Sequence, residues 1–396
     1  MDIERAAFLL KGVAHHTPLD RSVTFSEMAG LPVYLKLENL QKTGSFKIRG
    51  AYNKIAGLSA EEKRCGVIAA SAGNHAQGVA YAASRAGIKA TIVMPETAPL
   101  AKVSATKSYG AEVVLAGAGY DDAFTKAKEI QLFQGMTFVH AFNDSAVMAG
   151  QGTIALEILK DLPEVASIIV PVGGGGLIAG IAAAVKERAP HIRIFGVQAA
   201  GAPAASLSKH KGQRVITATA VTIADGIAVK EPGDETYPYI EKWVDDIVTV
   251  DDEAIASAIL MLLERAKLVV EGAGAVGLAA VIQQKLPLCG PTAVLISGGN
   301  IDVNFISRII ERGLVKAGRR AVLITSVVDR PGALQRLLGI IANSGGNVIH
   351  ISHNRVDHQV PLGQAEVQVS IETRNTAHTE EILAVMRREG YEVSVR

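Results

Sequence analysis

One lysine of the sequence, Lys47, lies in a setting that could make it a covalent catalyst. Gly44-Ser45-Phe46 precede it and Arg49-Gly50 follow it within the stretch KLENLQKTGSFKIRGA. Such a stretch indicates a lysine held in place, whereas most lysines are solvated surface charges. A lysine amine becomes a catalyst when a structured pocket lowers its pKa and presents it to a carbonyl carbon. Lys47 is therefore a candidate for Schiff-base chemistry.

A run of four glycines, Gly173 to Gly176, follows the apolar segment SIIVPV and precedes LIAGIAAAVKER. Glycines between a strand and a helix let backbone N–H groups approach an anion, and the helix N-terminus adds a favourable dipole. A phosphate site follows, with a sharp turn that binds nothing as the alternative. NAD is disfavoured because Gln198 ends the next strand, where a ribose needs a carboxylate, and no Lys-Ser or Lys-Thr follows the glycines as in a Walker loop.

Three further segments complete a pattern. They are SAGNHAQG (Ser71 to Gly78), EGAGA (Glu271 to Ala275) and SGGN (Ser297 to Asn300). Together with the Lys47 stretch and PVGGGGLIAG, in this order, they resemble the threonine dehydratases (threonine ammonia-lyases). These belong to the tryptophan synthase β-like class of pyridoxal phosphate (PLP) enzymes, of which the serine racemases are near relatives. The resemblance extends from about Arg5 to Gly318, and it implies PLP as the cofactor.

The resemblance also implies an activity and a role for each motif residue. The activity is conversion of L-threonine to 2-oxobutanoate and ammonia, with L-serine, giving pyruvate, as a second substrate. Lys47 would attach the cofactor covalently and then move the α-proton of the substrate. The other cofactor-binding residues would be Phe46 beside the ring, Asn74 at its phenolic oxygen, Ser297 at its pyridine nitrogen, Glu271 near the ring, and Gly173, Gly174, Gly175, Gly176 and Leu177 at the phosphate. The substrate carboxylate would lie at a helix N-terminus formed by Ser71, Gly73, Asn74 and His75.

Two of these residues have a second interpretation. Glu271 could instead cap the following helix, and His75 could be a helix-start histidine bonded to backbone.

Ser297 bears on the reaction type, because a neutral hydroxyl does not hold the pyridine nitrogen protonated as an aspartate does. Loss of the β-substituent is then the favoured outcome.

A racemase is the main rival within the same cofactor class. It needs a second proton donor, and where the serine racemases have a serine this chain has Ala72, which cannot exchange a proton. Those relatives also bind a divalent cation through two carboxylates, but this chain has Gln198 and Ala204 there, so no metal is expected. Hydroxyaspartate ammonia-lyase activity, or a non-catalytic amino-acid sensor, are the further alternatives.

Apolar runs that alternate with helical stretches predict an α/β fold with parallel sheets covered on both faces. The expected strands are GVIAAS, ATIVMP, EVVLAG, SIIVPV, IRIFGVQ and AVLISG, and two expected helices span residues 74–85 and 100–108. We expect a two-lobed catalytic domain over residues 1–318, of PLP fold type II. A small lobe, residues 51–148, would be inserted into a large lobe formed by residues 1–50 and 149–318. The motifs follow strands, so they should meet in one cleft.

After residue 318 the pattern changes to strand, helix, strand, strand, helix, strand, typical of a ferredoxin-like βαββαβ module. Residues 319–396 resemble an ACT domain, an amino-acid-sensing module. The resemblance implies an effector such as isoleucine or valine, bound between paired modules at Asp329, Gly332, Leu334 and Asn347. A small dimerisation domain that binds nothing is the alternative.

The composition agrees with a soluble globular chain. The 396 residues are 48% hydrophobic, with a net charge of +1, and they lack the basic blocks that nucleic-acid or membrane-surface binding requires. No disulfide or zinc site is expected, and Cys65 and Cys289 are predicted to be small buried residues in a reducing compartment.

The N-terminal stretch does not resemble a signal peptide, so a cytoplasmic location is expected. The charge-free run from Val165 to Val185 reads as strand, turn and helix, since Pro171 and the glycines would break a membrane helix. Family resemblance suggests a homotetramer.

Overall fold

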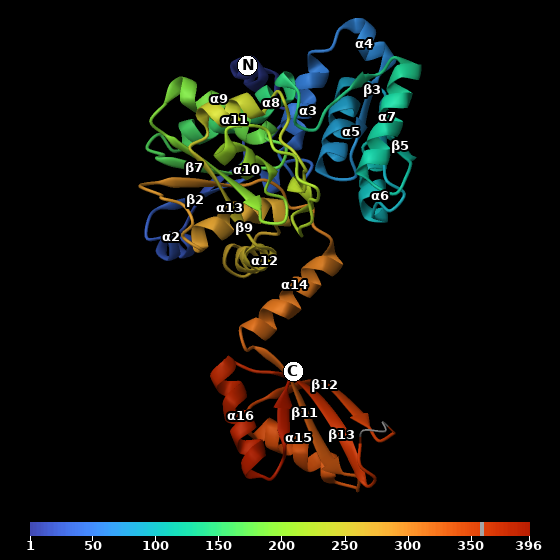
Figure 1. The fold of residues 1–396 in the computed structure, drawn as a ribbon, viewed down its shortest axis with the longest axis vertical. Helices are drawn as coiled ribbons and strands as arrows, with labels where there is room; N and C mark the ends of the chain where they lie inside the picture. Colours follow the sequence, from blue (N-terminus) through green and yellow to red (C-terminus); the bar gives the residue numbers. More distant parts are fainter. Residues whose placement is uncertain (357–359) are drawn as a thin grey trace. The chain divides into compact units, whose positions relative to one another are not determined.

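The computed structural model describes residues 1–356 and 360–396, and these form two compact units, Met1–Ile301 and Asp302–Arg396. The first unit contains two lobes, each built around its own sheet (Figure 1). Helix α14 (Val303–Lys316) is grouped with the second unit, whereas the sequence places the domain limit after residue 318. The limit between the two domains therefore stays a prediction.

The large lobe is a six-stranded sheet in the order β1-β2-β10-β7-β8-β9. Its strands are β1 (Leu19–Ser22), β2 (Val33–Leu37), β7 (Ser167–Pro171), β8 (Arg193–Ala199), β9 (Asp246–Val250) and β10 (Thr292–Ile296). All neighbours pair in parallel except β1, which is an antiparallel edge strand. Every residue of β7 and β10 is buried, as expected of parallel strands covered on both faces.

Helices cover both faces of this sheet. In Figure 1, α8, α9 and α11 lie on one side of the strands and α2, α12 and α13 on the other. The helices of the lobe are α1 (Ile3–Leu9), α2 (Val23–Ala29), α8 (Ser145–Asp161), α9 (Gly176–Arg188), α10 (Ala204–Lys211), α11 (Tyr237–Trp243), α12 (Asp252–Met261) and α13 (Gly272–Ile282). Shorter turns are η1 (Glu38–Leu40), η2 (Asp225–Ile227) and the π-helical turn η3 (Leu262–Ala266).

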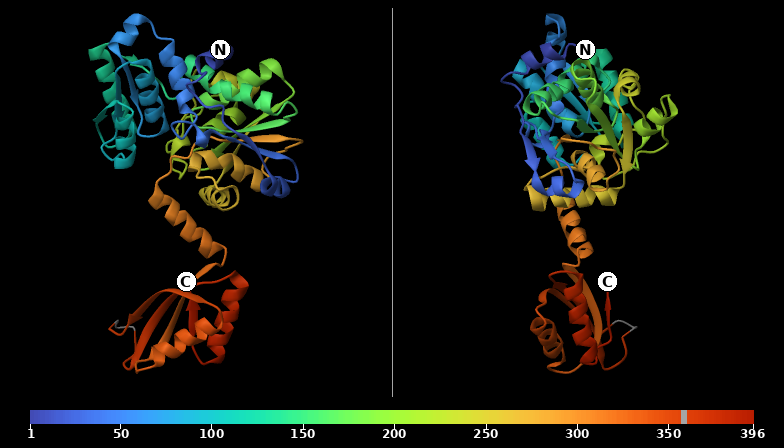
Figure 2. Two further views of the ribbon diagram at one scale, coloured as in Figure 1. Left: turned by 180° about the vertical axis from the view of Figure 1, so that it is seen from behind. Right: turned by 90° about the vertical axis from the view of Figure 1, so that its left-hand side faces the viewer.

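The small lobe has a four-stranded parallel sheet in the order β5-β4-β3-β6. Its strands are β3 (Val67–Ala70), β4 (Ala90–Met94), β5 (Glu112–Leu115) and β6 (Thr137–Phe138). Its helices are α3 (Lys47–Ala56), α4 (Ala60–Cys65), α5 (Asn74–Ala86), α6 (Leu100–Ser108) and α7 (Tyr120–Gln134), and Figure 2 shows the lobe from behind. The expected strands and helices of both lobes are thus confirmed.

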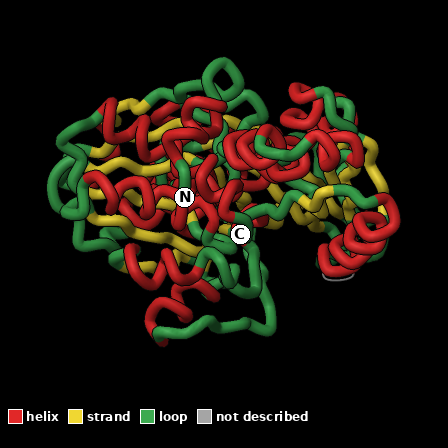
Figure 3. The backbone as a smooth tube through the Cα atoms, turned by 90° about the horizontal axis from the view of Figure 1, so that it is seen from above, coloured by secondary structure: helices red, strands yellow, loops and turns green. Residues whose placement is uncertain are grey.

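Three of the predicted motifs follow the carboxyl ends of parallel strands. The loop after β3 leads into α5, the glycine run after β7 leads into α9, and Ser297 follows β10 directly. Helices on both sides of the strands leave these ends free for ligands, and Figure 3 shows strands flanked by helices in this way. Apolar side chains of β7, α8 and α9 form one continuous core beneath the large-lobe motifs.

A buried ionic network fixes α3, which carries Lys47, against α8. The Arg49 guanidinium contacts Glu38 at 2.7 Å and Glu157 at 2.6 Å, and Lys36 contacts Glu157 at 2.7 Å. The Thr17 hydroxyl donates to Glu38 at 2.6 Å. Buried charges need such complete pairing, because removing one partner leaves an uncompensated charge. The network therefore holds the helix of Lys47 rigidly in place.

The second unit is an antiparallel sheet in the order β12-β13-β11-β14 with two helices packed on it. Its elements are β11 (Arg320–Val328), α15 (Ala333–Asn343), β12 (Asn347–Asn354), β13 (Gln364–Glu372), α16 (Thr376–Arg388) and β14 (Val393–Val395). This is the βαββαβ order expected from the sequence, so the predicted fold class is confirmed.

Two other expectations have different outcomes. Cys65 and Cys289 are both exposed, so the prediction that they are buried is wrong. Cys65 ends α4, a helix with no buried residue, and Cys289 lies in the connection that enters β10. The charge-free run is confirmed as strand, turn and helix, and among the described residues no helix is long and apolar enough to cross a membrane.

Candidate active site

Residues 44–46 are fastened to residues 297–299, and this places Lys47 beside the end of β10. The Phe46 N–H donates to the Ser297 carbonyl at 3.2 Å, and the Gly299 N–H donates to the Gly44 carbonyl at 2.9 Å. Gly44 has φ +71°, and a Cβ there would overlap the Asn300 side chain. A left-handed conformation and a close approach both require glycine. The glycine thus permits the turn that holds the lysine.

Lys47 is partly buried, and its amine contacts two groups at the cavity wall. Nζ donates to the Ala141 carbonyl at 3.0 Å and lies 5.2 Å from the centroid of the Phe46 ring. Burial lowers the pKa of Lys47 from 10.5 to about 8, against the opposing effect of the Glu271 carboxylate. Burial disfavours the charged form of an amine. A larger fraction of Lys47 is therefore neutral and nucleophilic near pH 8 than for an exposed lysine.

The side chain of Asn74 is oriented by two neighbours. Its Nδ2 donates to Glu271 Oε1 at 2.6 Å, and its Oδ1 accepts from Asn300 Nδ2 at 2.8 Å. An asparagine amide has two N–H donors, so one remains for a ligand. The Glu271 side chain makes no cap hydrogen bond to α13, so of its two interpretations the site role agrees better with its contacts.

The glycine run has no room for side chains. A Cβ on Gly174 would overlap the Phe142 ring, and one on Gly176 would lie 2.7 Å from the Phe142 carbonyl oxygen. Gly175 has φ +95° and forms the N-cap of α9. The Gly174 carbonyl accepts from the Thr236 hydroxyl at 2.7 Å. Backbone fixed in this way at the start of a 13-residue helix fits a phosphate group.

The loop after β3 also ends at a helix N-terminus. The Gly73 N–H bonds the Ser71 hydroxyl at 3.2 Å, and α5 begins at Asn74. The buried His75 ring bonds the Val139 carbonyl through Nε2 at 2.8 Å, and burial lowers its pKa to about 3. A carbonyl accepts only, so the neutral ring carries its proton on Nε2. His75 can therefore offer a substrate carboxylate only its backbone N–H.

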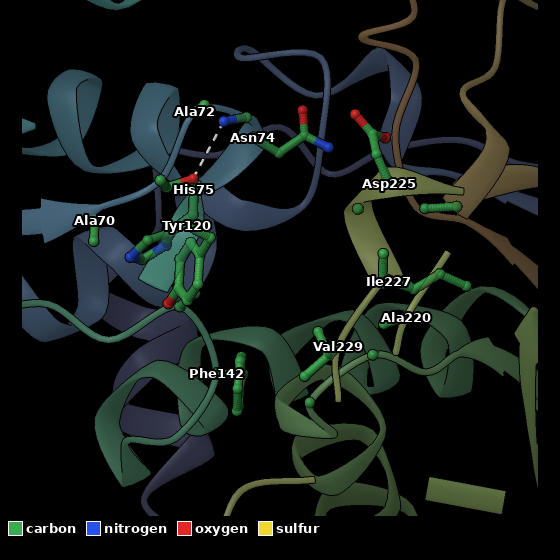
Figure 4. A pocket seen from close by; sticks show the side chains of 18 of the residues that line it. Ala70, Ala72, Asn74, His75, Tyr120, Phe142, Ala220, Asp225, Ile227 and Val229 are labelled. Carbon is green, nitrogen blue, oxygen red and sulfur yellow. Dashed lines mark hydrogen bonds between the residues drawn. The ribbon is translucent and has the colours of Figure 1, made fainter. Parts of the chain in front are cut away.

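One cavity of about 1050 Å³ brings the predicted residues together. Every cofactor and substrate residue predicted from the sequence lines it, with contributions from both lobes. Figure 4 shows His75 and Tyr120 on one side of the cavity and Asp225, Ile227 and Val229 on the other. At its rim Lys102 of the small lobe pairs with Asp225 of the large lobe at 2.9 Å.

The sequence reasoning missed several lining residues, among them His140, Phe142 and Tyr120. The histidine and the phenylalanine stand in the stretch VHAFND, which lies just after a strand, and this position was the available signal. Among the described residues there is no cluster of His, Cys, Asp or Glu that could hold a metal ion.

The four predicted effector residues of the second unit do not meet within one copy of the chain. Asn347 pairs with Glu372, which faces Arg320 at the start of β11, whereas Asp329 follows the end of β11. Gly332 and Leu334 lie with Asp329, at the start of α15. The predicted effector site would therefore need a second copy, and it stays a prediction.

Comparison with known proteins assigns the family. The family model described as "Pyridoxal-phosphate dependent enzyme" matches residues 11–298, and the ACT domain model matches residues 321–390. The chain belongs to the pyridoxal-phosphate-dependent enzymes. It carries a C-terminal ACT domain, so the resemblance found in the sequence is confirmed. Its cofactor is PLP. Three features fit that group: a glycine run with no room for side chains, a Lys47 amine of lowered pKa, and the second N–H of the Asn74 amide.

The chain is similar to proteins of two activities. An L-threonine ammonia-lyase of Thermotoga maritima is 54% identical over 100% of this chain and 98% of its own. A threonine deaminase of Solanum lycopersicum has a solved structure with TM-score 0.75 and 38% identity, over 78% of this chain and 92% of its own. The solved structure of maize serine racemase also has a TM-score of 0.75 and 38% identity, and the match covers 79% of this chain and 97% of the racemase chain. Fold similarity alone does not separate a lyase from a racemase.

Glu271 leads to a prediction about pH. Burial and the nearby Asp225 raise the pKa of Glu271 from 4.5 to about 7, although the Asn74 hydrogen bond opposes this. Between these values the folded protein holds a proton that the unfolded chain releases, so stability falls as pH rises. In cofactor-free protein Glu271→Gln should be more stable than the wild type by less than about 1 kcal/mol at pH 5 and by roughly 3 kcal/mol at pH 8.

Urea unfolding of both proteins at the two pH values measures this difference. The exposed Glu61, replaced in Glu61→Gln, is the control and should give no gain at pH 8. A gain for Glu271→Gln that is equal at pH 5 and pH 8 would contradict the raised pKa.

Proposed function

We propose that the protein dehydrates and deaminates L-threonine to 2-oxobutanoate and ammonia. The observation that carries this proposal is the convergence of Lys47, Asn74, Ser297 and the glycine run in one cavity, with the pKa of Lys47 lowered to about 8. The Thermotoga maritima relative, named an L-threonine ammonia-lyase, supports the same substrate.

The residues of the cavity would share the work as follows. Bound PLP supplies an electron sink for negative charge at the substrate α-carbon. The backbone N–H groups at the start of α5, with the Ser71 hydroxyl, would bind the carboxylate of threonine. Lys47, when neutral, would remove the α-proton, and it has the lowered pKa that a general base near neutral pH requires. The amine of Lys47 donates to the Ala141 carbonyl oxygen at 3.0 Å, and this bond limits the motion of the lysine side chain.

Elimination of the β-hydroxyl then follows from the neutral character of Ser297, which is 2% exposed at the end of β10. Loss of water from threonine gives aminocrotonate, whose tautomer takes up water and releases ammonia and 2-oxobutanoate. L-serine, which also carries a β-hydroxyl, would give pyruvate by the same steps. We infer that it is the second substrate.

Racemisation is the second candidate and has less support. Ala72 lies in the cavity wall, where a serine could exchange a proton and a methyl group cannot. Gln198 is buried and its Oε1 accepts from the Ser206 N–H at 2.8 Å, so the oxygen that could bind a cation already bonds the local backbone. Hydroxyaspartate also has less support as a substrate, because its second carboxylate needs a positive group. Lys102 and Lys230 line the cavity, but both already form ion pairs at its rim, with Asp225 and Asp121.

Regulation by an amino acid such as isoleucine or valine is a further proposal, supported by the ACT domain at residues 321–390. It becomes allostery once two states with different substrate affinity are measured. A homotetramer and a cytoplasmic location stay predictions.

The test compares products. PLP-loaded protein is incubated with L-threonine and, separately, with L-serine, and both the 2-oxo acid and the D-amino acid are measured over time, with and without isoleucine. We expect 2-oxobutanoate and pyruvate to form with little D-serine, and isoleucine to change the rate. D-serine in excess of pyruvate would support the racemase instead.

A further inference from the structure

Four residues at the cavity, His140 to Asn143, form a short loop between β6 and α8, which we call the 140–143 loop. Two of its backbone N–H groups bond to the same side-chain atom. His140 Nδ1 accepts hydrogen bonds from the backbone N–H groups of Phe142 at 3.3 Å and Asn143 at 2.9 Å. Because Nδ1 accepts, a neutral His140 ring must carry its proton on Nε2.

The surroundings keep this ring neutral. Burial and the nearby Lys47 lower the pKa of His140 to about 4, and Lys128 acts in the same direction, whereas Asp144 and Asp234 oppose it. The ring also packs edge-on against Phe142, with 4.7 Å between centroids. A protonated imidazole has two donors and no acceptor, so it could not hold the loop in this shape.

The 140–143 loop touches the reactive lysine and the phosphate loop. The Ala141 carbonyl accepts from Lys47 Nζ at 3.0 Å. The Phe142 ring fills the space beside Gly174, and the Phe142 backbone lies against Gly176. A shift of this loop would therefore move both partners of the cofactor at once.

The last residue of the loop ties it to the large lobe. Asn143 Nδ2 donates to Asp234 at 2.6 Å, and Asn143 Oδ1 accepts from the Glu235 N–H at 2.9 Å. The neighbouring Gly233 N–H in turn donates to the Gly174 carbonyl at 3.0 Å. The loop thus reaches the glycine run from two directions.

We propose that His140 is a positioning residue, whose Nδ1 lone pair folds the 140–143 loop so that Lys47 and the glycine run are held at the spacing the cofactor needs. The inference rests on the proposed roles of Lys47 and the glycines and does not depend on which amino acid is the substrate.

Two substitutions separate the acceptor from the bulk of the ring. In His140→Asn the side-chain oxygen can occupy the place of Nδ1, whereas His140→Leu puts a methyl group there. The first measurement is the dissociation constant of PLP, by absorbance titration of protein freed of cofactor. We expect His140→Leu to bind PLP at least about tenfold more weakly, as two lost hydrogen bonds imply, and His140→Asn to stay within about threefold of the wild type.

The second measurement is amide hydrogen exchange, read for Phe142 and Asn143 in both variants and the wild type, each saturated with PLP. Exchange should accelerate in His140→Leu and be largely restored to wild-type rates in His140→Asn. Equal PLP affinity and equal exchange in the two variants, whether near the wild type or both impaired, would overturn the proposal. If the wild type binds PLP but does not act on threonine, the proposed substrate fails while this test remains decisive.

Discussion

Replacing Lys47 with alanine is expected to lower the rate of 2-oxobutanoate formation at least about a thousandfold, because the variant loses both the covalent attachment point and the base. Lys47 lines the cavity, and burial lowers its pKa to about 8. Steady-state kinetics with L-threonine at saturating PLP measure the effect. An external amine such as methylamine, added at high concentration, should restore part of the rate.

Lys230→Ala is the matched control. Lys230 also lines the cavity, but it is 53% exposed and its ion pair with Asp121 spans 3.4 Å. Exposed pairs of this kind contribute up to about 1 kcal/mol. The control should therefore lose less than about tenfold in rate. A Lys47→Ala variant that keeps a rate within tenfold of the wild type would remove Lys47 from the chemistry.

Gly176→Ala should weaken PLP binding about a hundredfold and lower the free energy of unfolding by roughly 1–3 kcal/mol. The added Cβ would lie 2.7 Å from the Phe142 carbonyl oxygen and 2.8 Å from its Cα, both backbone atoms. Backbone cannot rotate away as a flexible side chain can, so the glycine run or the 140–143 loop must move. Titration with PLP and urea unfolding of the cofactor-free protein give the two quantities.

Gly339→Ala tests whether the effect is local. Gly339 is inside α15 of the ACT domain, and nothing lies within 4 Å of an added Cβ. Alanine is favoured over glycine in a helix by about 1 kcal/mol, so this control should keep its PLP affinity and unfold no more easily. Unchanged PLP affinity in Gly176→Ala would mean that the glycine run does not hold the phosphate.

The sequence could predict the site where function depends on short segments that follow strands. Lys47, the loop before Asn74, the glycine run and Ser297 each stand at such a position, and all of them line the same cavity. Parallel strands end at one edge of a sheet, so residues that follow them converge even when far apart in the chain. The strand and helix patterns were likewise strong enough to predict the two sheets.

Contacts between distant side chains could not be predicted in this way. The hydrogen bonds that orient Asn74 come from Glu271 and Asn300, and no local pattern pairs them. The position of the proton on the His140 ring depends on the backbone N–H groups of Phe142 and Asn143. These groups reach the ring only in this particular loop conformation, which the sequence does not reveal. Cys65 was predicted to be buried from residue type alone, but it stands at the exposed end of α4.

The most direct test of the central claim is reduction of the PLP-loaded protein with borohydride, followed by peptide mapping of the modified lysine. Lys47, Lys102 and Lys230 all line the cavity, so the result is not determined by position alone. We predict that the reduced cofactor is found on Lys47, in the peptide that contains Gly44 to Arg49. Cofactor on Lys102, Lys230 or any other lysine would contradict the assignment of the active site.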